Sequence, residues 1–243
     1  MLKEFKMDLH IHSCLSPCSD NAMVPSEIIS KAIENELDAI GITDHNSVEN
    51  VEAVKKAGEK KAFPVFGGIE ITTCEEIHIL AFLDDKSLKD IQNIIYDNLT
   101  GTNDVEYFGE QIIMDDCDNI IGYNNKMLVG AIDLSINEII NLIHSLNGIA
   151  IASHIDKQAY SIISQLGFIP EGLQIDALEL SPNHHLYPID YNKYGFPLVE
   201  FSDAHFLSDI GKVYTRFIVE DVTISELKKA IINEDKRTVK CRN

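Results

Sequence analysis

No apolar stretch of this 243-residue sequence approaches the roughly 18 residues that a membrane-spanning helix needs. The first six residues, Met1–Lys6, lack the long apolar segment of a secretory signal peptide. Internal repeats and low-complexity linkers are absent as well. We therefore expect a globular protein of the cytoplasm with no membrane partner.

Basic residues are scarce. The sequence has 20 Lys and Arg against 39 Asp and Glu, a net charge of −19. A general nucleic-acid surface needs clustered Lys and Arg to displace counterions, and no basic run is present. The charge therefore argues against extended nucleic acid and favours a small phosphorylated substrate. It does not exclude an anionic substrate, because bound divalent cations invert the local field of an acidic site. The oligomeric state is left open.

Cysteines are few and odd in number: there are five. Cys14 and Cys18 flank a short loop, but a second pair that would complete a four-sulfur metal site is missing. A cytoplasmic chain keeps its thiols reduced. We expect free thiols in a loop.

What the sequence does contain is a regular alternation of apolar, strand-like runs with helical patterns, and its 45% hydrophobic content is enough for a sizeable core. Repeated β-α units with short connections favour a parallel sheet or barrel. The expected strands are Phe5–Ile11, Asp38–Thr43, Phe63–Ile71, Ile77–Leu83, Gly148–Ser153, Ala177–Leu180, Leu198–Phe201 and Val213–Val219. The expected helices are Pro25–Glu36, Ser47–Lys61, Ser87–Leu99, Ile136–Leu146, Ala159–Gly167 and Ile224–Glu234.

Residues 101–130 interrupt this alternation. The segment is polar and rich in Asp, Asn and Gly. Short β-like pieces, Gln111–Met114 and Lys126–Val129, predict a hairpin insertion. The hairpin lies beside or over a functional site, or it is a surface loop without a function. The sequence leaves both alternatives open.

Metal-ligating residue types gather at strand ends. His10 and His12 close the first strand, where residues i and i+2 project to one face and can aim two imidazoles at one metal. Asp8 falls on the same face, one step back. His78 begins its strand, and a tight turn between Phe63–Ile71 and Ile77–Leu83 would return it to the same rim. The other candidates follow further strands: His45, Glu70, His154, Asp203 and His205.

An isolated histidine at a strand end is more often an ordinary polar group than a ligand, and an isolated Asp or Glu there often caps the next helix. Here six of nine histidines fall at one rim, where an α/β barrel builds its active site. Neutral imidazole and carboxylate suit zinc, manganese or iron. With Asp20 the candidates number nine, more than one ion holds, so we expect two or three divalent metal ions, two of them bridged by Glu70.

Together these motifs resemble the PHP family, the polymerase and histidinol phosphatase domain. The resemblance rests on Asp8–Ser13, Ile42–His45, Gly68–Ile71, Ile77–Leu80, His154 and Ser202–His205. It implies an α/β fold, an irregular (β/α)7 TIM-like barrel that takes in residues 1–243 as a single domain with the insertion at about 101–130. It also implies a phosphoesterase with a two- or three-metal site.

The family pattern further implies an allocation of ligands. One metal takes His10, His12, Glu70 and Asp203; a second shares Glu70 and takes His78 and His154; a third takes Asp20, His45 and His205. Glu70 and Asp203 would hold the metal-activated hydroxide. Asp8 and Asp44 would support the ligands from behind.

Substrate-binding candidates are Lys157, His184 and Arg216. Lys157 follows His154 by three residues, and His184 with its neighbour His185 follows the strand Ala177–Leu180. The alternative for each is a solvated side chain on the surface.

Three functions are compatible with the sequence. The one we favour is a metal-dependent phosphoesterase acting on a small metabolite or nucleotide. The second is an exonuclease of the same family that trims short oligonucleotides, which would need stacking or basic residues in a groove. The third is a metal-binding module without catalysis.

Overall fold

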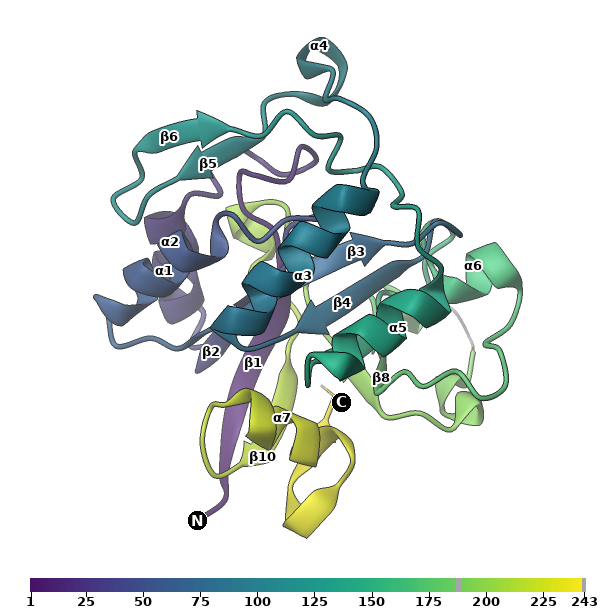
Figure 1. Cartoon of the computed structure of the whole chain (residues 1–243). Coiled ribbons are helices and arrows are strands. Elements are labelled where there is room, and N and C mark those ends of the chain that lie inside the picture. Colours follow the sequence, from purple (N-terminus) through teal and green to yellow (C-terminus); the bar gives the residue numbers. More distant parts are fainter. Residues whose placement is uncertain (187–188, 242–243) are drawn as a thin grey trace.

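The computed structural model describes residues 1–186 and 189–241. Within these residues one sheet contains nine strands, in the order β11-β10-β1-β2-β3-β4-β7-β8-β9 (Figure 1). The strands are β1 (Lys3–Ile11), β2 (Ala39–Ile42), β3 (Val65–Thr72), β4 (His78–Phe82), β7 (Ile149–Ala152), β8 (Ala177–Leu180), β9 (Leu198–Glu200), β10 (Thr215–Val219) and β11 (Thr238–Lys240).

The seven strands from β1 to β9 curl into a barrel. A parallel bridge joins Ile11 at the end of β1 to Ala204 just beyond β9, and the His12 amide donates to the Ala204 carbonyl at 2.9 Å. Strand β4 runs antiparallel to both of its neighbours, β3 and β7, while the other neighbouring pairs of the seven are parallel. Strands β10 and β11 extend the sheet beyond β1. The predicted irregular TIM-like barrel is confirmed.

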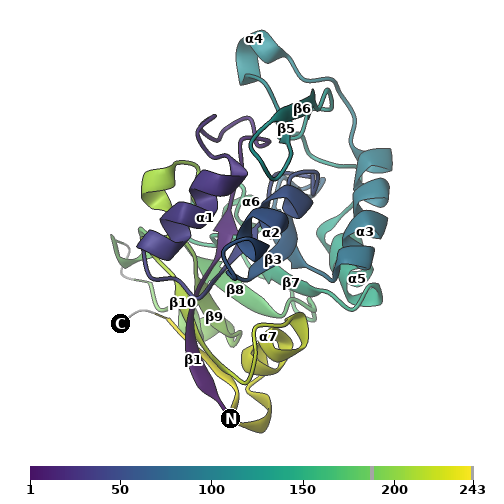
Figure 2. The ribbon, with the colours of Figure 1, turned by 90° about the vertical axis from the view of Figure 1, so that its left-hand side faces the viewer.

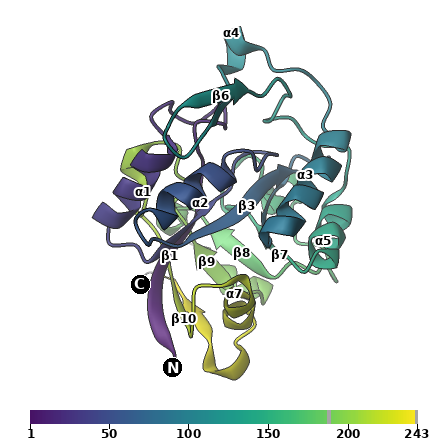
Figure 3. The same cartoon turned by 60° about the vertical axis from the view of Figure 1, so that its left-hand side comes forward.

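Helices cover the outer face of the barrel. In Figure 3, α1, α2, α3 and α5 follow one another around the sheet. Figure 2 shows α7 at the end of the barrel where β1 begins, opposite the end that carries α4. The helices are α1 (Pro25–Glu34), α2 (Val51–Glu59), α3 (Asp85–Asn98), α4 (Val105–Phe108), α5 (Ile136–Ser145), α6 (Ile162–Leu166) and α7 (Ile224–Ile231). Short 3-10 turns occupy His184–Leu186, Tyr191–Tyr194, Leu207–Asp209 and Glu234–Lys236.

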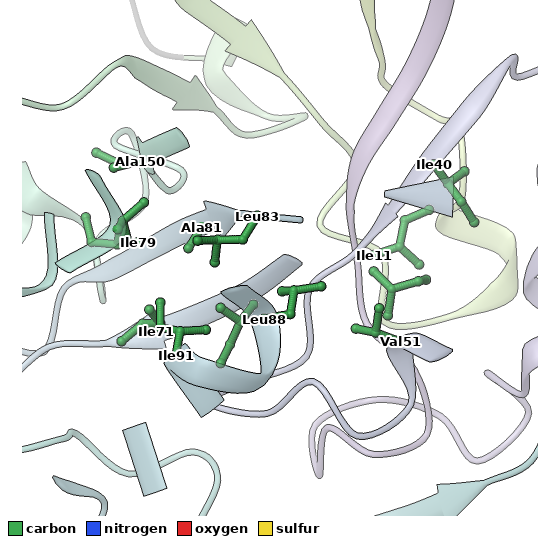
Figure 4. Close-up of a cluster of buried hydrophobic side chains, with 14 of the residues drawn as sticks. Ile11, Ile40, Val51, Ile71, Ile79, Ala81, Leu83, Leu88, Ile91 and Ala150 are labelled. Carbon is green, nitrogen blue, oxygen red and sulfur yellow. The ribbon is translucent and has the colours of Figure 1, made fainter. Parts of the chain in front are cut away.

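Two layers of apolar side chains follow from the alternation of the strands. One layer packs the sheet against the outer helices; it contains Ile71, Ile79 and Ala150 (Figure 4). The other fills the barrel interior and includes Phe82 and Phe201. Each fully buried Ile or Phe contributes about 1.5–3 kcal/mol relative to an exposed side chain. Because Ile69 and Ile71 face the helices, Glu70 between them faces the interior.

Residues 101–130 carry α4 and a two-stranded sheet of β5 (Ile112–Met114) and β6 (Ile120–Tyr123). The first β-like piece is therefore a strand, but Lys126–Val129 is not, and that expectation is wrong. The side chain of Gln111 hydrogen-bonds to backbone groups of residues 126–129. Its Nε2 donates to the Lys126 carbonyl at 2.6 Å, and its Oε1 accepts from the Leu128 amide at 3.2 Å.

Two further elements differ from expectation. Helix α6 begins only at Ile162, because the Ser161 hydroxyl caps it by accepting from the Ser164 amide. Strand β11 was not expected; it pairs with β10 at the edge of the sheet. Among the described residues, no helix combines the length and apolar character needed to cross a bilayer. The cytoplasmic location stays a prediction.

Candidate metal centre

The candidate ligands lie at strand ends that meet at one end of the barrel. Residues 101–130, with α4, β5 and β6, lie at the top of Figure 1. His10 lies one residue before the end of β1, and Glu70 lies near the end of β3. His78 opens β4 directly opposite Thr72, so the tight turn expected between these antiparallel strands is present. His154 and Asp203 follow β7 and β9, and both have a positive φ, 29° and 50°. A positive φ is uncommon for residues other than glycine, and such backbone clusters at functional sites in proteins.

Glu70 is at the centre of the site. Its side chain is 1% exposed, and five imidazoles surround its two oxygens. The nitrogen–oxygen distances are 3.3 Å for His10, 3.4 Å for His12, 3.2 Å for His45, 3.0 Å for His78 and 3.3 Å for His154. We call these residues, with Asp203 and His205, the His–carboxylate cluster.

Several polar atoms of this cluster have no hydrogen-bond partner although they are buried. These include Nδ1 of His45, Nδ1 of His78 and Oε1 of Glu70. The Nε2 atoms of His10 and His12 face each other at 3.1 Å. Leaving such atoms buried and unpaired is costly, whereas a cation among them would accept all of their lone pairs. The donor set therefore fits the divalent metals that the family pattern implies.

The ligating atoms form three overlapping groups, each within 4.8 Å. One contains His10, His12, Glu70 and Asp203; a second contains His45, Glu70 and His78; a third contains His12, His45 and His205. Glu70 belongs to two of them, as a bridging carboxylate would. The first group coincides with the expected ligands of one metal. The second group places His45 beside His78, whereas His154, the expected partner of His78, approaches the same Glu70 oxygen as His78, Oε1.

Hydrogen bonds behind the cluster orient two of its histidines. Nδ1 of His10 lies 2.9 Å from Oε1 of Glu179, which turns Nε2 toward the cluster. Nδ1 of His12 lies 3.0 Å from the Ser16 hydroxyl, and that hydroxyl donates to Asp44 at 2.6 Å. Asp44 therefore acts on His12 through Ser16. Such partners fix the ring orientation and tautomer of a metal-binding histidine.

Asp8 acts on the loop beyond β9. Its carboxylate accepts from the Ser202 amide at 3.0 Å and from the Gly211 amide at 2.8 Å. The pairing of β1 with β2 shifts register between Asp8 and Ile11, so Asp8 does not follow the simple alternation with His10 that the sequence suggested. Burial raises the pKa of Asp8 to about 6, although these hydrogen bonds lower it.

Electrostatics divide the cluster into charged and neutral groups. Burial opposes the charge of Glu70, but the surrounding histidines, His78 and His10 first, hold its pKa well below the usual range. Burial likewise opposes the charge of His10, but Glu179 and Glu70 raise its pKa well above the usual range. For His45, burial dominates and lowers the pKa well below the usual range. Burial and the charge of His12 lower the pKa of His205 to about 4.

A cavity of about 950 Å³ opens above the cluster. Cluster residues line its floor, and Lys157 lies beside them. The Lys157 ammonium pairs with Asp203 while its side chain remains 41% exposed. Of the three substrate-binding candidates, Lys157 is therefore the one that the structure places at the cluster.

Three sequence-predicted residues lie apart from the cluster. The Asp20 amide donates to the His205 carbonyl, but its carboxylate accepts from the Ala22 amide at 2.7 Å. His184 contacts Glu200 on β9 at 3.5 Å. Arg216 contacts Glu4 at 3.4 Å and pairs in register with Lys6, at the opposite end of β1 from His10. The ligand role of Asp20 and the substrate roles of His184 and Arg216 stay predictions without support from these contacts.

Glu179 is the residue that sequence reasoning missed. It is fully buried on β8 and also accepts from the His154 amide at 3.0 Å. The signal was present: Ala177–Leu180 places one acidic side chain inside an otherwise apolar four-residue strand. A buried carboxylate requires a partner, and the His10 imidazole on β1 and the His154 amide just beyond β7 supply it.

Fold and site define the class of a metal-dependent hydrolase of phosphoric esters. The chain belongs to the PHP domain family, whose sequence model matches residues 8–168. A second family model, described as PHP-associated, matches residues 191–235. Family membership makes the chain a metal-dependent phosphoesterase by class; its substrate and the number and identity of its metals are separate questions.

Known proteins resemble the chain over nearly all of its length. A PolC-type DNA polymerase III of Ureaplasma parvum is 25% identical over 98% of the chain, which spans 19% of that polymerase. The lesion-specific endonuclease Q of Pyrococcus furiosus has the same fold, with a TM-score of 0.74, 19% identity and 98% of the chain covered. An endonuclease Q bound to a 27-mer duplex substrate matches with a TM-score of 0.72, 19% identity and 97% of the chain covered. The chain spans 58% of each endonuclease structure.

These comparisons overturn one expectation. We expected a small phosphorylated substrate and argued against extended nucleic acid, whereas the same fold serves an endonuclease that holds a 27-mer duplex. The expectation failed because the net charge of −19 is a sum over the whole chain. It says nothing of the one surface that meets a substrate, where bound cations change the local charge.

Proposed function

We propose that this chain is a metal-dependent phosphodiesterase that cleaves nucleic acid. The observation that carries the proposal is the buried Glu70 carboxylate with five imidazoles at 3.0–3.4 Å, at the floor of an open cavity. The likeness to endonuclease Q supports nucleic acid as the substrate class. One domain over residues 1–243, with an insertion at 101–130, is part of the proposal.

Residues of the cluster would hold two or three divalent ions of zinc, manganese or iron. Bound there, such ions lower the pKa of a water molecule and neutralise charge on a phosphoryl group during displacement. We assign one ion to His10, His12, Glu70 and Asp203, and a second to Glu70, His78 and His154. We assign a third to His45 and His205, with Asp20 as the least supported ligand.

The chain's own side chains supply orientation and charge. Glu179 and the pair of Ser16 and Asp44 keep Nε2 of His10 and of His12 directed into the cluster. Lys157 stands at the cavity floor, where its ammonium can contact a non-bridging phosphate oxygen when it leaves Asp203. Glu70 and Asp203 remain ionised at neutral pH, because neighbouring histidines, and for Asp203 also Lys157, hold their pKa values well below the usual range against the effect of burial.

A nuclease panel tests the proposal. Protein loaded with manganese, iron or zinc, with metal content measured, is incubated with single-stranded DNA, duplex DNA and single-stranded RNA, each with free and with blocked ends. We expect cleavage of at least one substrate, and its loss in Glu70→Gln. Glu59→Gln is the matched control, since Glu59 lies exposed on α2. If the loaded protein cleaves no member of the panel, the proposal is wrong.

A further inference from the structure

The cavity above the cluster has two unlike sides. Its floor consists of imidazoles and carboxylates. Apolar side chains make up much of the remaining lining: the 101–130 segment contributes Phe108, Met127 and Val129, and the loop before α6 contributes Tyr160. We call these four residues the apolar wall. The sequence left open whether residues 101–130 lie over a functional site or form a surface loop without a function. In the structure they line the cavity.

Hydrogen bonds fix this wall to the cluster. Asn46 directly follows the cluster residue His45, and its Nδ2 donates to the carbonyls of Leu128 and Gly130, both at 2.8 Å. The Asn46 side chain is fully buried, and its Oδ1 accepts from the Thr72 amide at 3.1 Å. These bonds tie residues 128–130, and with them Val129 of the wall, to the residue that follows His45.

Tyr160 connects the floor with the wall. Its ring stacks on the imidazole of His78 with centroids 4.6 Å apart and an interplanar angle of 16°. Its backbone carbonyl accepts from the His78 amide at 2.9 Å. The tyrosine nevertheless remains 43% exposed, so part of its ring is free to meet a ligand in the cavity.

The charge of the cavity limits how a nucleic acid can be held there. Of the described residues that line it, Lys157 is the single Lys or Arg, and it already faces Asp203. Backbone phosphates other than the one at the floor would find no cation in this lining. Apolar and aromatic surface can instead bind a nucleobase by stacking, which is worth about 1–3 kcal/mol per base and tolerates any sequence.

We propose that the apolar wall stacks the base of the nucleotide next to the scissile phosphate, and that this base must be unpaired. The proposal rests on the proposed nuclease function. A paired base inside a duplex has both faces covered by its neighbours, so it can reach the wall only at a strand end, in a single strand or after leaving the helix. Phe108 and Met127 are thus specificity-determining residues for unpaired nucleotides, in DNA or RNA.

Binding is measured first, without turnover. A short oligonucleotide with 2-aminopurine beside a central phosphorothioate linkage is added to the metal-loaded protein, as DNA and as RNA. Stacking quenches the fluorescence of this base. We expect quenching by the unaltered protein, and binding about tenfold weaker in Phe108→Ala and in Met127→Ala. The control is Ile121→Ala, because Ile121 is 65% exposed on the same segment and does not line the cavity.

Cleavage of matched substrates, which differ only in the presence of one base, then distinguishes this inference from the proposed function. Each protein is given oligonucleotides with a normal or an abasic nucleotide on either side of the cleaved linkage. We expect Phe108→Ala to lower kcat/KM about tenfold for the normal substrate and to leave the abasic one unchanged. Equal effects on both substrates, or no quenching by the unaltered protein, would overturn the stacking wall while nuclease activity stands. Quenching that depends on Phe108 without any cleavage would keep the wall and reject the nuclease.

Discussion

Among single residues, Glu179 illustrates how much of the metal centre depends on side chains that touch no metal. Its two oxygens serve two cluster histidines: Oε1 lies 2.9 Å from Nδ1 of His10, and Oε2 accepts from the His154 amide. Because a carboxylate only accepts, the neutral form of His10 that binds a metal carries its proton on Nδ1, which leaves the lone pair on Nε2. The tautomer needed for metal binding is thus set from behind.

Removing this carboxylate should therefore weaken metal binding. For Glu179→Ala we expect metal affinity 10–100-fold lower by calorimetric titration, the usual effect of losing such a partner. Glu179→Gln should fall between this variant and the unaltered protein, because an amide oxygen can still accept from His10. Circular dichroism checks that both variants are folded. Unaltered affinity in Glu179→Ala would show that His10 does not need this contact.

At the scale of elements, the sequence predicted most strands and helices because their periodicity is local. Ala177–Leu180 is a strand with the predicted bounds, and α1 begins at Pro25 as the proline indicated. The features that the sequence did not predict depend on contacts between segments that lie apart in the chain. The register shift in β1 that changes the direction of His10 depends on pairing with β2. Lys126–Val129 is not a strand, and its Lys126 carbonyl accepts from the side chain of Gln111.

Helix α7 and its neighbours offer a test of element-level electrostatics away from the metal centre. Glu226 on α7 accepts from Nε of Arg237 at 3.0 Å. This hydrogen bond, with one from the Glu220 amide, lowers the pKa of Glu226 from its ordinary value of 4.5 to about 2. A carboxylate with a depressed pKa stabilises the folded state above its unfolded pKa, and that contribution is lost as pH falls through the folded pKa.

We therefore expect Glu226→Gln to lower the free energy of unfolding at neutral pH. The difference from the unaltered protein should shrink as pH falls below about 4.5 and vanish near pH 2. Urea unfolding at a series of pH values measures it, with Glu234→Gln, an exposed carboxylate of the same region, as the control. A difference that stays constant from pH 7 to pH 2 would contradict this interpretation of the Arg237 contact.

For the whole molecule, the barrel and the cluster depend on each other. Six strands, β1, β2, β3, β4, β7 and β9, bring cluster residues to one rim, and the bridge from Ile11 to Ala204 closes it. Most candidate ligands were found from sequence because strand ends of a barrel converge in a known way. The expectation of a small substrate failed, since a sum of charges over the whole chain carries no information on where a partner binds.

Metal removal should therefore lower the thermal stability of the whole fold. Without metal, the buried Nδ1 atoms of His45 and His78 lie near Glu70 but have no hydrogen-bond partner. Metal at about a thousand times its Kd stabilises the folded state by about 4 kcal/mol, which corresponds to a Tm about 10 °C higher for a chain of this size. Differential scanning calorimetry before and after chelation, and after re-addition of manganese, measures this. Identical Tm values in the three states would argue against metal binding at the cluster.

The most direct test of the account is the metal content and nuclease activity of His10→Ala beside the unaltered protein. We predict two or three metal ions per chain and cleavage of nucleic acid for the unaltered protein. We predict that His10→Ala loses the ion shared by His10, His12, Glu70 and Asp203 and loses cleavage with it, while circular dichroism shows a retained fold. A His10→Ala protein that cleaves nucleic acid at the unaltered rate would contradict the account.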